Sequence, residues 1–458
     1  MSSSVPESTV AETLAERIVA VKPAMLPTET VQKCEDLLID VTGLCVTARK
    51  EDYVLSAATA FDDGGISTVI GHRRTLSAAG AAFVNGTAAH GQDFDDTFEG
   101  GPVHAGAVIV PAVLAASERY NADGGMALLG IAVGTEVLCR LSLVVPKAVH
   151  RSGFHPTAVF GALGAAAGVS AALGMPEQEI VDALGIAGSM ASGIIEYLAE
   201  GAWTKRMHAG WAAQSGIRAA LLARAGFIGP RTVFEGVHGL FQAFAHTNDG
   251  DYDALVGDFG ERWVIDALAF KPYPCGTMAQ PYIDCARRLA ARGIAPEDVS
   301  EIVCEVAEGT VHRLWEPLAD KQAPPNGYAA KFAVPYLLAF GFVHGGVGLG
   351  AFTESAIGDE RVLALAAKVK FVIDPENPYP NSFTGHIKAT LNDGSVIEER
   401  QPHLRGGAQE PLMRQDVVDK FRLNAQHGGW SEAQAEAALM LIERLYQQGR
   451  IDLGALRV

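Results

Sequence analysis

The chain has 458 residues, of which 48% are hydrophobic and only 19% are charged; this supplies a large folded core and excludes a disordered or fibrous protein. Its formal net charge of −17 opposes binding to nucleic acid or to an anionic membrane, because like charges repel. Six scattered cysteines without a C-x-x-C pair indicate neither a zinc cage nor a disulfide framework, so we expect a cytoplasmic protein.

Residues from about 8 to 245 read as consecutive helices separated by short Gly/Pro segments. The N-terminus lacks the basic start and apolar core of a secretory signal. We predict helices over residues 29–50, 75–91, 105–120, 125–145, 155–174, 177–194 and 208–226. The apolar run over 158–175 is shorter than the roughly 20 residues of a membrane span. Its alanines and glycines favour closely packed, buried helices, so we expect one large all-α domain and no membrane span.

The pattern changes after about residue 270. Residues 301–308, 368–375 and 385–401 alternate as strands do, the last with an Asp-Gly turn at 393–394. Residues 430–448 return to an amphipathic helix with Ser431 as its N-cap. We therefore predict a mainly α fold: a large helical domain formed by both chain ends (1–269 and 406–458) and an inserted, smaller α+β lid domain (270–405).

The segment HGQDFDDTFEGGPVH (90–104) is the first polar node. If the preceding helix continued through it, Asp93, Asp96 and Thr97 would share a face, and Asp95 would point roughly 200° away and hold local structure. A solvated loop is the plain alternative, but apolar segments flank the cluster. No recognisable second ligand set accompanies His90, Asp93 and His104, so we predict no metal. A carbocation cyclase using D-x-D-D would require more aromatic residues than this chain has.

Two further nodes precede apolar helices. His155 lies at the start of one predicted helix (HRSGFHPTAVFG). It is either a capping or packing residue or, in a functional role, part of a site that binds a carboxylate at the helix N-terminus. Lys205 and Arg206 (GAWTKRMHAGW) form either an exposed basic turn or, in so acidic a chain, a receptor for a small polyanion. Lys271, and Lys331 with Tyr336, add positive charge and a phenol from the second domain.

Cofactor motifs are missing from the sequence. GGVGLG (345–350) lacks the spacing and context of a dinucleotide site, and neither a Walker loop nor a G-x-S-x-G elbow occurs. We therefore predict side-chain chemistry without a cofactor.

Taken together, the segments AAHGQDFDDT, GFHPTAVFGALGAAA, TKRMHAGWAAQSGI, KPYPCG and AKFAVPY resemble the MmgE/PrpD family. This family includes 2-methylcitrate dehydratase, cis-aconitate decarboxylase and iminodisuccinate epimerase. The resemblance implies a homodimer with a site between the helical domain and the lid. It places these residues in the site: Asp93, Thr97, His104, His155 and Lys205, with Tyr336 and Lys331 from the lid. The chain has Met278 and Gln280 where the family often shows a histidine, and we assign Gln280 and Lys271 to substrate binding.

Chemistry shared by these relatives is proton movement at a carbon next to a carboxylate. We expect Lys205, helped by Arg206 or the helix start at His155, to bind that carboxylate. His104, poised by Asp93, is the predicted acid–base group, while Thr97 and Tyr336 would orient the substrate or relay a proton. The prediction is a lyase of the 2-methylcitrate dehydratase type acting on a small di- or tricarboxylate. An epimerase or isomerase of an iminodisuccinate-like dicarboxylate and a non-catalytic carboxylate-binding relative are the alternatives.

Overall fold

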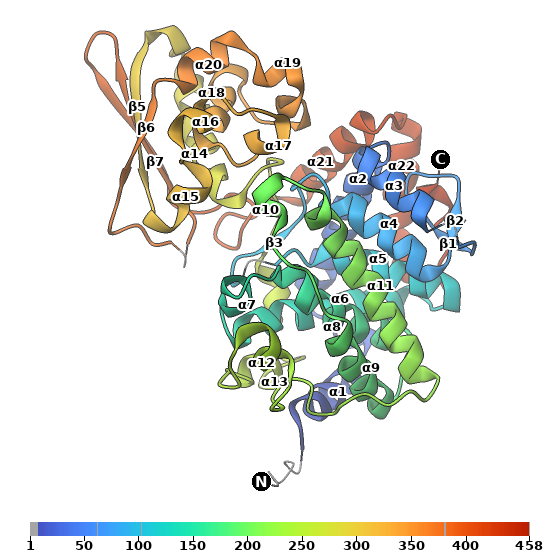
Figure 1. Cartoon of the computed structure of the whole chain (residues 1–458). Helices are drawn as coiled ribbons and strands as arrows, with labels where there is room; N and C mark the ends of the chain where they lie inside the picture. Colours follow the sequence, from blue (N-terminus) through green and yellow to red (C-terminus); the bar gives the residue numbers. More distant parts are fainter. Residues whose placement is uncertain (1–7, 62, 102, 380–381, 458) are drawn as a thin grey trace. The chain divides into compact units, whose positions relative to one another are not determined.

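The computed structural model describes residues 8–61, 63–101, 103–379 and 382–457. Its contacts divide the chain into two units (Figure 1). Unit 1 comprises Met1–Leu268 and Met413–Val458, and unit 2 comprises Ala269–Leu412. The fold is mainly α, as predicted.

Unit 1 is built almost entirely of helices. Its longer helices are α1 (Val10–Ala20), α2 (Thr28–Ala48), α3 (Asp52–Ala60), α4 (Ala78–His90), α5 (Gly106–Tyr120), α6 (Gly124–Val144), α8 (Pro156–Ala172), α9 (Glu177–Met190), α11 (Thr204–Arg224), α21 (Arg414–His427) and α22 (Glu432–Arg444). Short elements are α7 (Ala148–Arg151), α10 (Tyr197–Glu200), α12 (Leu240–Ala245), α13 (Asp253–Val256), β1 (Ser67–Thr68), β2 (Thr75–Leu76) and β3 (Thr97–Phe98). The two residues of β4 (Leu268–Ala269) lie on either side of the unit boundary. Each of the seven helices expected from the sequence is present.

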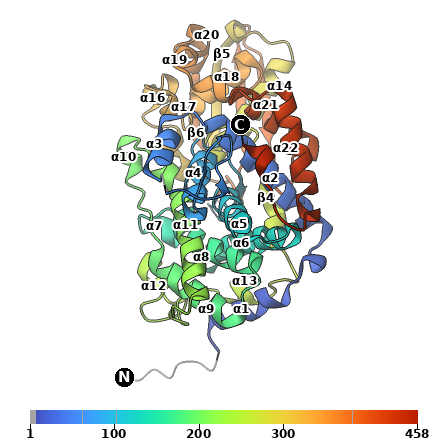
Figure 2. The ribbon, with the colours of Figure 1, turned by 90° about the vertical axis from the view of Figure 1, so that its right-hand side faces the viewer.

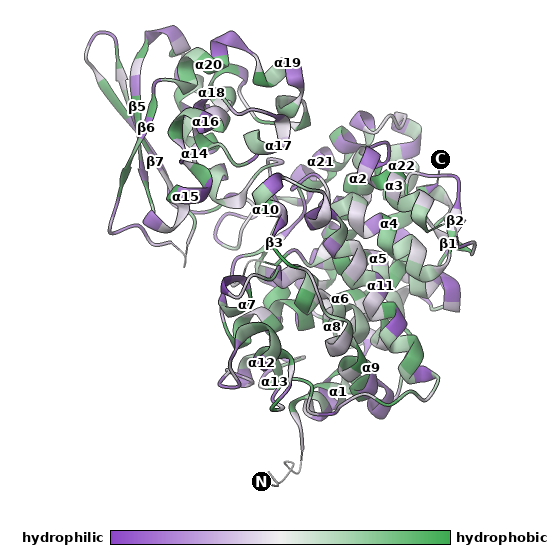
Figure 3. Ribbon diagram, in the orientation of Figure 1, coloured by the Kyte–Doolittle hydropathy of each residue, from purple (hydrophilic) through white to green (hydrophobic). Residues whose placement is uncertain are grey.

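The helices α6 and α8 form the centre of unit 1 and are mostly hydrophobic (Figure 3). By length and composition α6 could cross a membrane, but 94% of its apolar window is buried inside the structure. Small residues bring the two helices together: a Cβ on Gly130 would lie 2.6 Å from the Gly168 carbonyl oxygen. The apolar sequence of α6 is therefore explained by its burial against α8.

A second close contact joins α4 and α11. A Cβ on Gly210 of α11 would lie 2.1 Å from the backbone oxygen of Phe83 on α4, and one on Gly86 would lie 2.7 Å from the Gly210 Cα. Only glycine permits this approach, because any side chain would overlap the opposing backbone. The contact brings the C-terminal end of α4 and the N-terminal part of α11 into one region of unit 1.

The C-terminal helices α21 and α22 return to unit 1 and pack against α2 (Figure 2). Ser431 caps α22 in a capping box with Gln434, as the sequence predicts. On α21, the buried Lys420 pairs with Asp40 of α2 at 2.7 Å and donates to the carbonyl oxygen of Phe94 at 2.7 Å. Helix α21 therefore contacts and stabilises the loop that follows α4.

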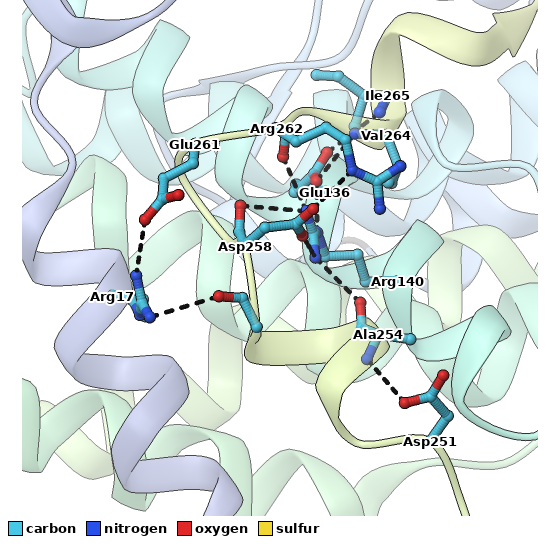
Figure 4. A network of polar contacts seen from close by, with 11 residues as sticks. Arg17, Glu136, Arg140, Asp251, Ala254, Asp258, Glu261, Arg262, Val264 and Ile265 are labelled. Carbon is cyan, nitrogen blue, oxygen red and sulfur yellow. Dashed lines mark hydrogen bonds and ion pairs between the residues drawn. The ribbon is translucent and has the colours of Figure 1, made fainter.

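Unit 1 also holds a buried ion pair between Glu136 and Arg140 on α6 (Figure 4). Arg140 Nε donates to Glu136 at 2.6 Å, and the guanidinium also donates to the backbone oxygens of Ala254 and Arg262. The Glu136 carboxylate accepts backbone N–H groups of the segment that follows Arg262. These bonds attach residues 254–265 to the central helix α6.

Unit 2 combines a mixed sheet with helices, as the strand pattern predicts. Its helices are α14 (Gln280–Ala291), α15 (Val311–Leu314), α16 (Leu318–Gln322), α17 (Gly327–Ala330), α18 (Val334–His344), α19 (Glu354–Ile357) and α20 (Glu360–Ala366), and its strands are β5 (Val299–Val306), β6 (Val369–Ile373), β7 (Gly385–Leu391) and β8 (Val396–Gln401). The sheet order is β6-β5-β7-β8, with β5 and β6 parallel and the other pairs antiparallel. Helix α14 packs on β7 and β8 (Figure 1), so one face of the sheet contributes to a buried core.

Candidate functional site

The loop after α4 differs from its helical expectation. α4 ends at His90, and Asp93 has a left-handed φ of 55°, a conformation that L-residues do not sustain in a helix. Thr97 is buried in β3, so Asp93 and Thr97 do not share a face of a helix, in contrast to the prediction from helical spacing. A non-glycine residue held with positive φ is a feature that clusters at functional sites.

Helical geometry predicts that Asp95 points away from the site, and this prediction is wrong. Its Oδ2 lies 2.6 Å from Nδ1 of His90, and both side chains are completely buried. His90 Nε2 is also buried and has no hydrogen-bond partner among the described residues. The pair is a desolvated carboxylate–imidazole contact in which the carboxylate orients the ring.

His104 precedes α5 and is oriented by Asp96. Its Nδ1 lies 2.6 Å from the Asp96 backbone oxygen, and because a carbonyl only accepts, Nδ1 is the donor and the basic lone pair of the neutral ring is on Nε2. The Asp96 carboxylate accepts N–H groups of Ala105 and Gly106 at 2.9 Å. Burial, and secondarily the charge of Asp95, raises the pKa of Asp96 to about 7. The Asp96 backbone oxygen thus orients the His104 ring, and the carboxylate of Asp93, which we expect to poise His104, pairs with Lys205.

Four histidines from different elements of unit 1 lie together. The ring centre of His90 is 5.2 Å from that of His104 and 5.5 Å from that of His155, and His155 is 5.3 Å from His208. His155 is the N-cap residue of α8, as predicted, and its Nδ1 lies 3.1 Å from His208 Nδ1. One of these nitrogens must accept, so at least one of the two rings is unprotonated there.

Burial, the largest cause, and the neighbouring histidines lower the pKa of His155 well below its usual range. Burial also lowers the pKa of His208, to about 4. Both rings are therefore neutral at pH 7. Of the four, His104 keeps the most solvent contact, with 13% of its side chain exposed.

Lys205 lies in the first turn of α11, which begins at Thr204, earlier than the sequence indicates. Its ammonium pairs with the carboxylate of Asp93, and both side chains are buried. Lys205 and His208 are three residues apart, so they share a face of α11. The guanidinium of Arg206 lies 4.5 Å from the ring centre of Tyr53, a cation–π contact.

The structure therefore brings together in unit 1 four predicted residues: Asp93, His104, His155 and Lys205. Thr97 is buried in β3. The sequence prediction missed His90 and Asp95 as a pair and also Tyr197, and it noted His208 only as a member of the basic segment with Lys205 and Arg206, without a role in the site. The Tyr197 ring lies 5.8 Å from the His208 ring. A helical spacing of three from Lys205 could have identified His208. Nothing in the sequence links Tyr197 to it.

Two predicted residues of unit 2 brace the KPYPCG segment. Gln280 begins α14, and its Nε2 donates to the backbone oxygens of Tyr273 and Cys275 at 3.3 and 3.4 Å. Lys331 Nζ donates to the Pro274 oxygen at 3.1 Å and lies 4.3 Å from the ring centre of Phe352. Lys271 lies in the same segment and is 3% exposed.

Tyr336 is a core residue of unit 2. It is completely buried among hydrophobic side chains, its hydroxyl donates to the Ala351 oxygen at 2.6 Å, and burial raises its pKa. A proton relay needs a hydroxyl that can reach the substrate, so the predicted catalytic role is corrected to a structural one. Within the residues that the structure describes, no three His, Cys, Asp or Glu side chains are arranged to hold a metal ion.

Comparison with known families covers most of the chain, including the segments that carry these residues. The model of the MmgE/PrpD N-terminal domain matches residues 12–253, and that of the MmgE/PrpD C-terminal domain matches residues 273–445. The chain belongs to the MmgE/PrpD family.

Relatives named for cis-aconitate decarboxylase match most of the chain, and one named for 2-methylcitrate dehydratase matches less than half of it. A cis-aconitate decarboxylase-like protein of Aspergillus oryzae, oryM, is 27% identical over 92% of both chains. Cis-aconitate decarboxylase of Mus musculus is 31% identical over 75% of this chain and 71% of its own. The mitochondrial 2-methylcitrate dehydratase of Yarrowia lipolytica is 24% identical over 42% of this chain and 39% of its own. These MmgE/PrpD relatives are lyases, which supports a lyase-type function.

The neutral His208 predicts a dependence of stability on pH. Its folded pKa of about 4 is below the value of about 6.5 in an unfolded chain. The contribution of His208 to the free energy of unfolding is therefore complete above about pH 6.5 and is lost as the pH falls towards 4. Between pH 7 and 5 we expect the free energy of unfolding to fall by about 1–2 kcal/mol through this group, measured by urea denaturation.

Replacing His208 with asparagine should remove that part of the slope. The same substitution at the exposed His427 on α21 is the control and should leave the slope as in the unsubstituted protein. Equal pH slopes for His208→Asn and His427→Asn would show that His208 is not held neutral.

Proposed function

We propose that the chain is a lyase that breaks a bond next to a carboxylate of a small tricarboxylate or dicarboxylate, with decarboxylation of a cis-aconitate-like substrate as the preferred reaction. The observation that carries the proposal is the buried Lys205–Asp93 pair in the same unit as the histidine cluster. The relatives named cis-aconitate decarboxylase also match more of the chain than the dehydratase does. Dehydration of a 2-methylcitrate-like substrate is therefore the second candidate.

Substrate carboxylates would be bound by Lys205. An ammonium has three N–H donors, so Asp93 can hold the group in place while another donor binds the substrate. The positive charge then offsets the negative charge that develops on the substrate carboxylate as the reaction proceeds. Neutral His155 and His208 supply hydrogen bonds without adding charge.

Proton delivery is assigned to His104. In decarboxylation of an unsaturated tricarboxylate, the bond between carbon and the leaving carboxylate breaks and CO₂ departs. The electron pair shifts through the adjacent double bond to the far carbon, which accepts a proton from Nε2 of the protonated His104 ring. The ring takes up that proton from solvent before the step and is neutral after it. No net oxidation or reduction occurs. Asp96 fixes the ring through Nδ1, which directs Nε2 to this task.

The proposal is tested by proton NMR in D₂O. The protein is incubated with cis-aconitate, with 2-methylcitrate or with an iminodisuccinate-like dicarboxylate. We expect loss of CO₂ with one deuteron incorporated. His104→Gln should lower the rate by about 10²–10⁴-fold, the usual contribution of a positioned general acid. His427→Gln, an exposed change on the same unit, should retain the rate.

Any other outcome of the NMR experiment would indicate a different function. Loss of water identifies the dehydratase, exchange of C–H for C–D without net conversion identifies an epimerase, and binding without exchange identifies a non-catalytic relative. Full activity of His104→Gln would remove His104 from the mechanism.

A further inference from the structure

Unit 2 contains a groove of about 800 Å³ that none of the predicted site residues lines. It runs along α14 and the turn 293–296, and the end of α18 completes one side. Four arginines line it: Arg287, Arg288, Arg361 and Arg405. Asp284 is the one acidic residue among the lining residues described. So concentrated a set of guanidinium groups is unexpected in a chain of net charge −17.

Asp284 neutralises only part of this charge. Its buried Oδ1 accepts from the Tyr273 hydroxyl at 2.6 Å and from Arg405 Nε at 3.0 Å, and Arg287 Nη1 lies 3.7 Å away. Arg287 and Arg405 also both donate to the Tyr273 hydroxyl. One carboxylate is thus shared by two guanidinium groups, while Arg288 pairs with Glu399 and Arg361 with Glu297. The four arginines therefore face three carboxylates, and the excess positive charge lies on Arg287 and Arg405 beside the buried phenol of Tyr273.

Three guanidinium groups retain unused donors. Arg287 uses Nε for the Gly345 oxygen and Nη1 for Tyr273; Arg405 uses Nε and Nη2; Arg361 uses Nε and Nη2 for Glu297. Within the described parts of the chain, the remaining terminal nitrogen of each has no hydrogen-bond partner. A planar guanidinium with free N–H groups matches the geometry of a carboxylate or phosphate.

The rest of the groove is apolar. Ile294 and Val343 pack partly buried against the core of unit 2, and Phe342 is buried in it. Apolar surface next to fixed donors is the usual composition of a small-molecule site. An inorganic anion alone would leave this wall uncovered.

We propose that the groove binds a small organic polyanion, one that carries two or more carboxylate or phosphate groups on a carbon framework. The arginines bind its anionic groups, and the wall at Ile294 and Phe342 packs against its framework. The inference goes beyond the proposed lyase function, because no residue assigned to that reaction lines the groove. The groove therefore forms a second ligand site on the chain.

Isothermal titration calorimetry with the full chain tests the site. The probes are tricarballylate, adenosine diphosphate and inorganic pyrophosphate, which separate carboxylate, organic phosphate and phosphate alone. We expect at least one organic probe to bind more tightly than pyrophosphate. In the double variant Arg287→Gln and Arg361→Gln, binding should weaken by about tenfold or more, because charge-assisted hydrogen bonds are lost. Both side chains are substantially exposed, so the fold should be retained, as circular dichroism would verify.

Controls separate this site from the proposed active site. Arg400→Gln, an exposed change on β8 outside the groove, should leave binding unchanged, and Lys205→Met should also leave the groove ligand bound. Turnover by the double variant in the absence of probe should match the unsubstituted protein, whatever reaction the enzyme performs. Four results would each overturn the proposal. Two of them are absence of probe binding at millimolar concentration and equal affinity of the double variant for the probes. The other two are tighter binding of pyrophosphate than of both organic probes and loss of binding in Lys205→Met.

Discussion

Replacing Lys205 with methionine is expected to lower turnover of the true substrate by about 10²–10³-fold, the usual effect of removing one group that stabilises developing negative charge. Methionine retains the length of the buried stem but removes the ammonium. The loss should appear mainly in kcat, because the interaction strengthens as charge develops on the substrate carboxylate. Steady-state kinetics by product NMR or CO₂ release measures the change.

The variant also removes the ammonium that pairs with the buried Asp93 carboxylate, so stability must be separated from catalysis. Lys205→Met with Asp93→Asn removes both charges and should regain much of the lost stability while remaining inactive. Arg218→Met, an exposed change on the same helix α11, should behave as the unsubstituted protein. Activity of Lys205→Met within about threefold of the unsubstituted protein would contradict the role given to Lys205.

Replacing Arg140 with methionine should lower the free energy of unfolding of unit 1 by about 3–5 kcal/mol, because Glu136 would remain as a buried, unpaired charge. Both side chains of this pair are fully buried, and burial raises the pKa of Glu136. The backbone oxygens of Ala254 and Arg262 also lose their donor. Urea unfolding followed by tryptophan fluorescence suits the measurement.

Arg262 supplies the matched control for that prediction. It pairs with Asp258 at 2.6 Å, but 68% of its side chain is exposed, and such surface pairs contribute at most about 1 kcal/mol. Arg262→Met should therefore change stability by less than about 1 kcal/mol. Combining Arg140→Met with Glu136→Gln should recover part of the loss, since no uncompensated charge is then buried. Equal effects of Arg140→Met and Arg262→Met would show that burial of the pair does not control its contribution.

Local periodicity is sufficient to predict many of the longer elements of this chain. The seven helices of the first half, the strands β5 to β8 and the cap at Ser431 follow from side-chain spacing and capping chemistry. α21, which lacks a strong apolar stripe, was not predicted. The three polar nodes and the family were also identified from sequence, because each node stands as a compact polar segment beside apolar helices.

Contacts that depend on irregular backbone or on packing cannot be predicted in this way. Helical spacing predicts that Asp95 points away from the site, yet Asp95 and His90 form a buried pair. That result depends on α4 ending at His90 and on the left-handed Asp93, and neither has a periodic signal. The hydroxyl of Tyr336 lies beside Ala351, a partner that sequence spacing does not indicate.

Spacing and capping chemistry along the chain are thus enough to predict the mainly α fold, the order of the longer helices and the residue types available for proton transfer. The pairs that form in the folded chain are known only from its packing: Lys205 with Asp93, His90 with Asp95, His104 with Asp96, and His155 with His208. The physical reason is that helix and strand periodicity arises from neighbours within a few residues. The protonation and orientation of a buried group depend instead on charges and dipoles brought to it by packing, such as the close approach of α4 and α11 at Gly86 and Gly210.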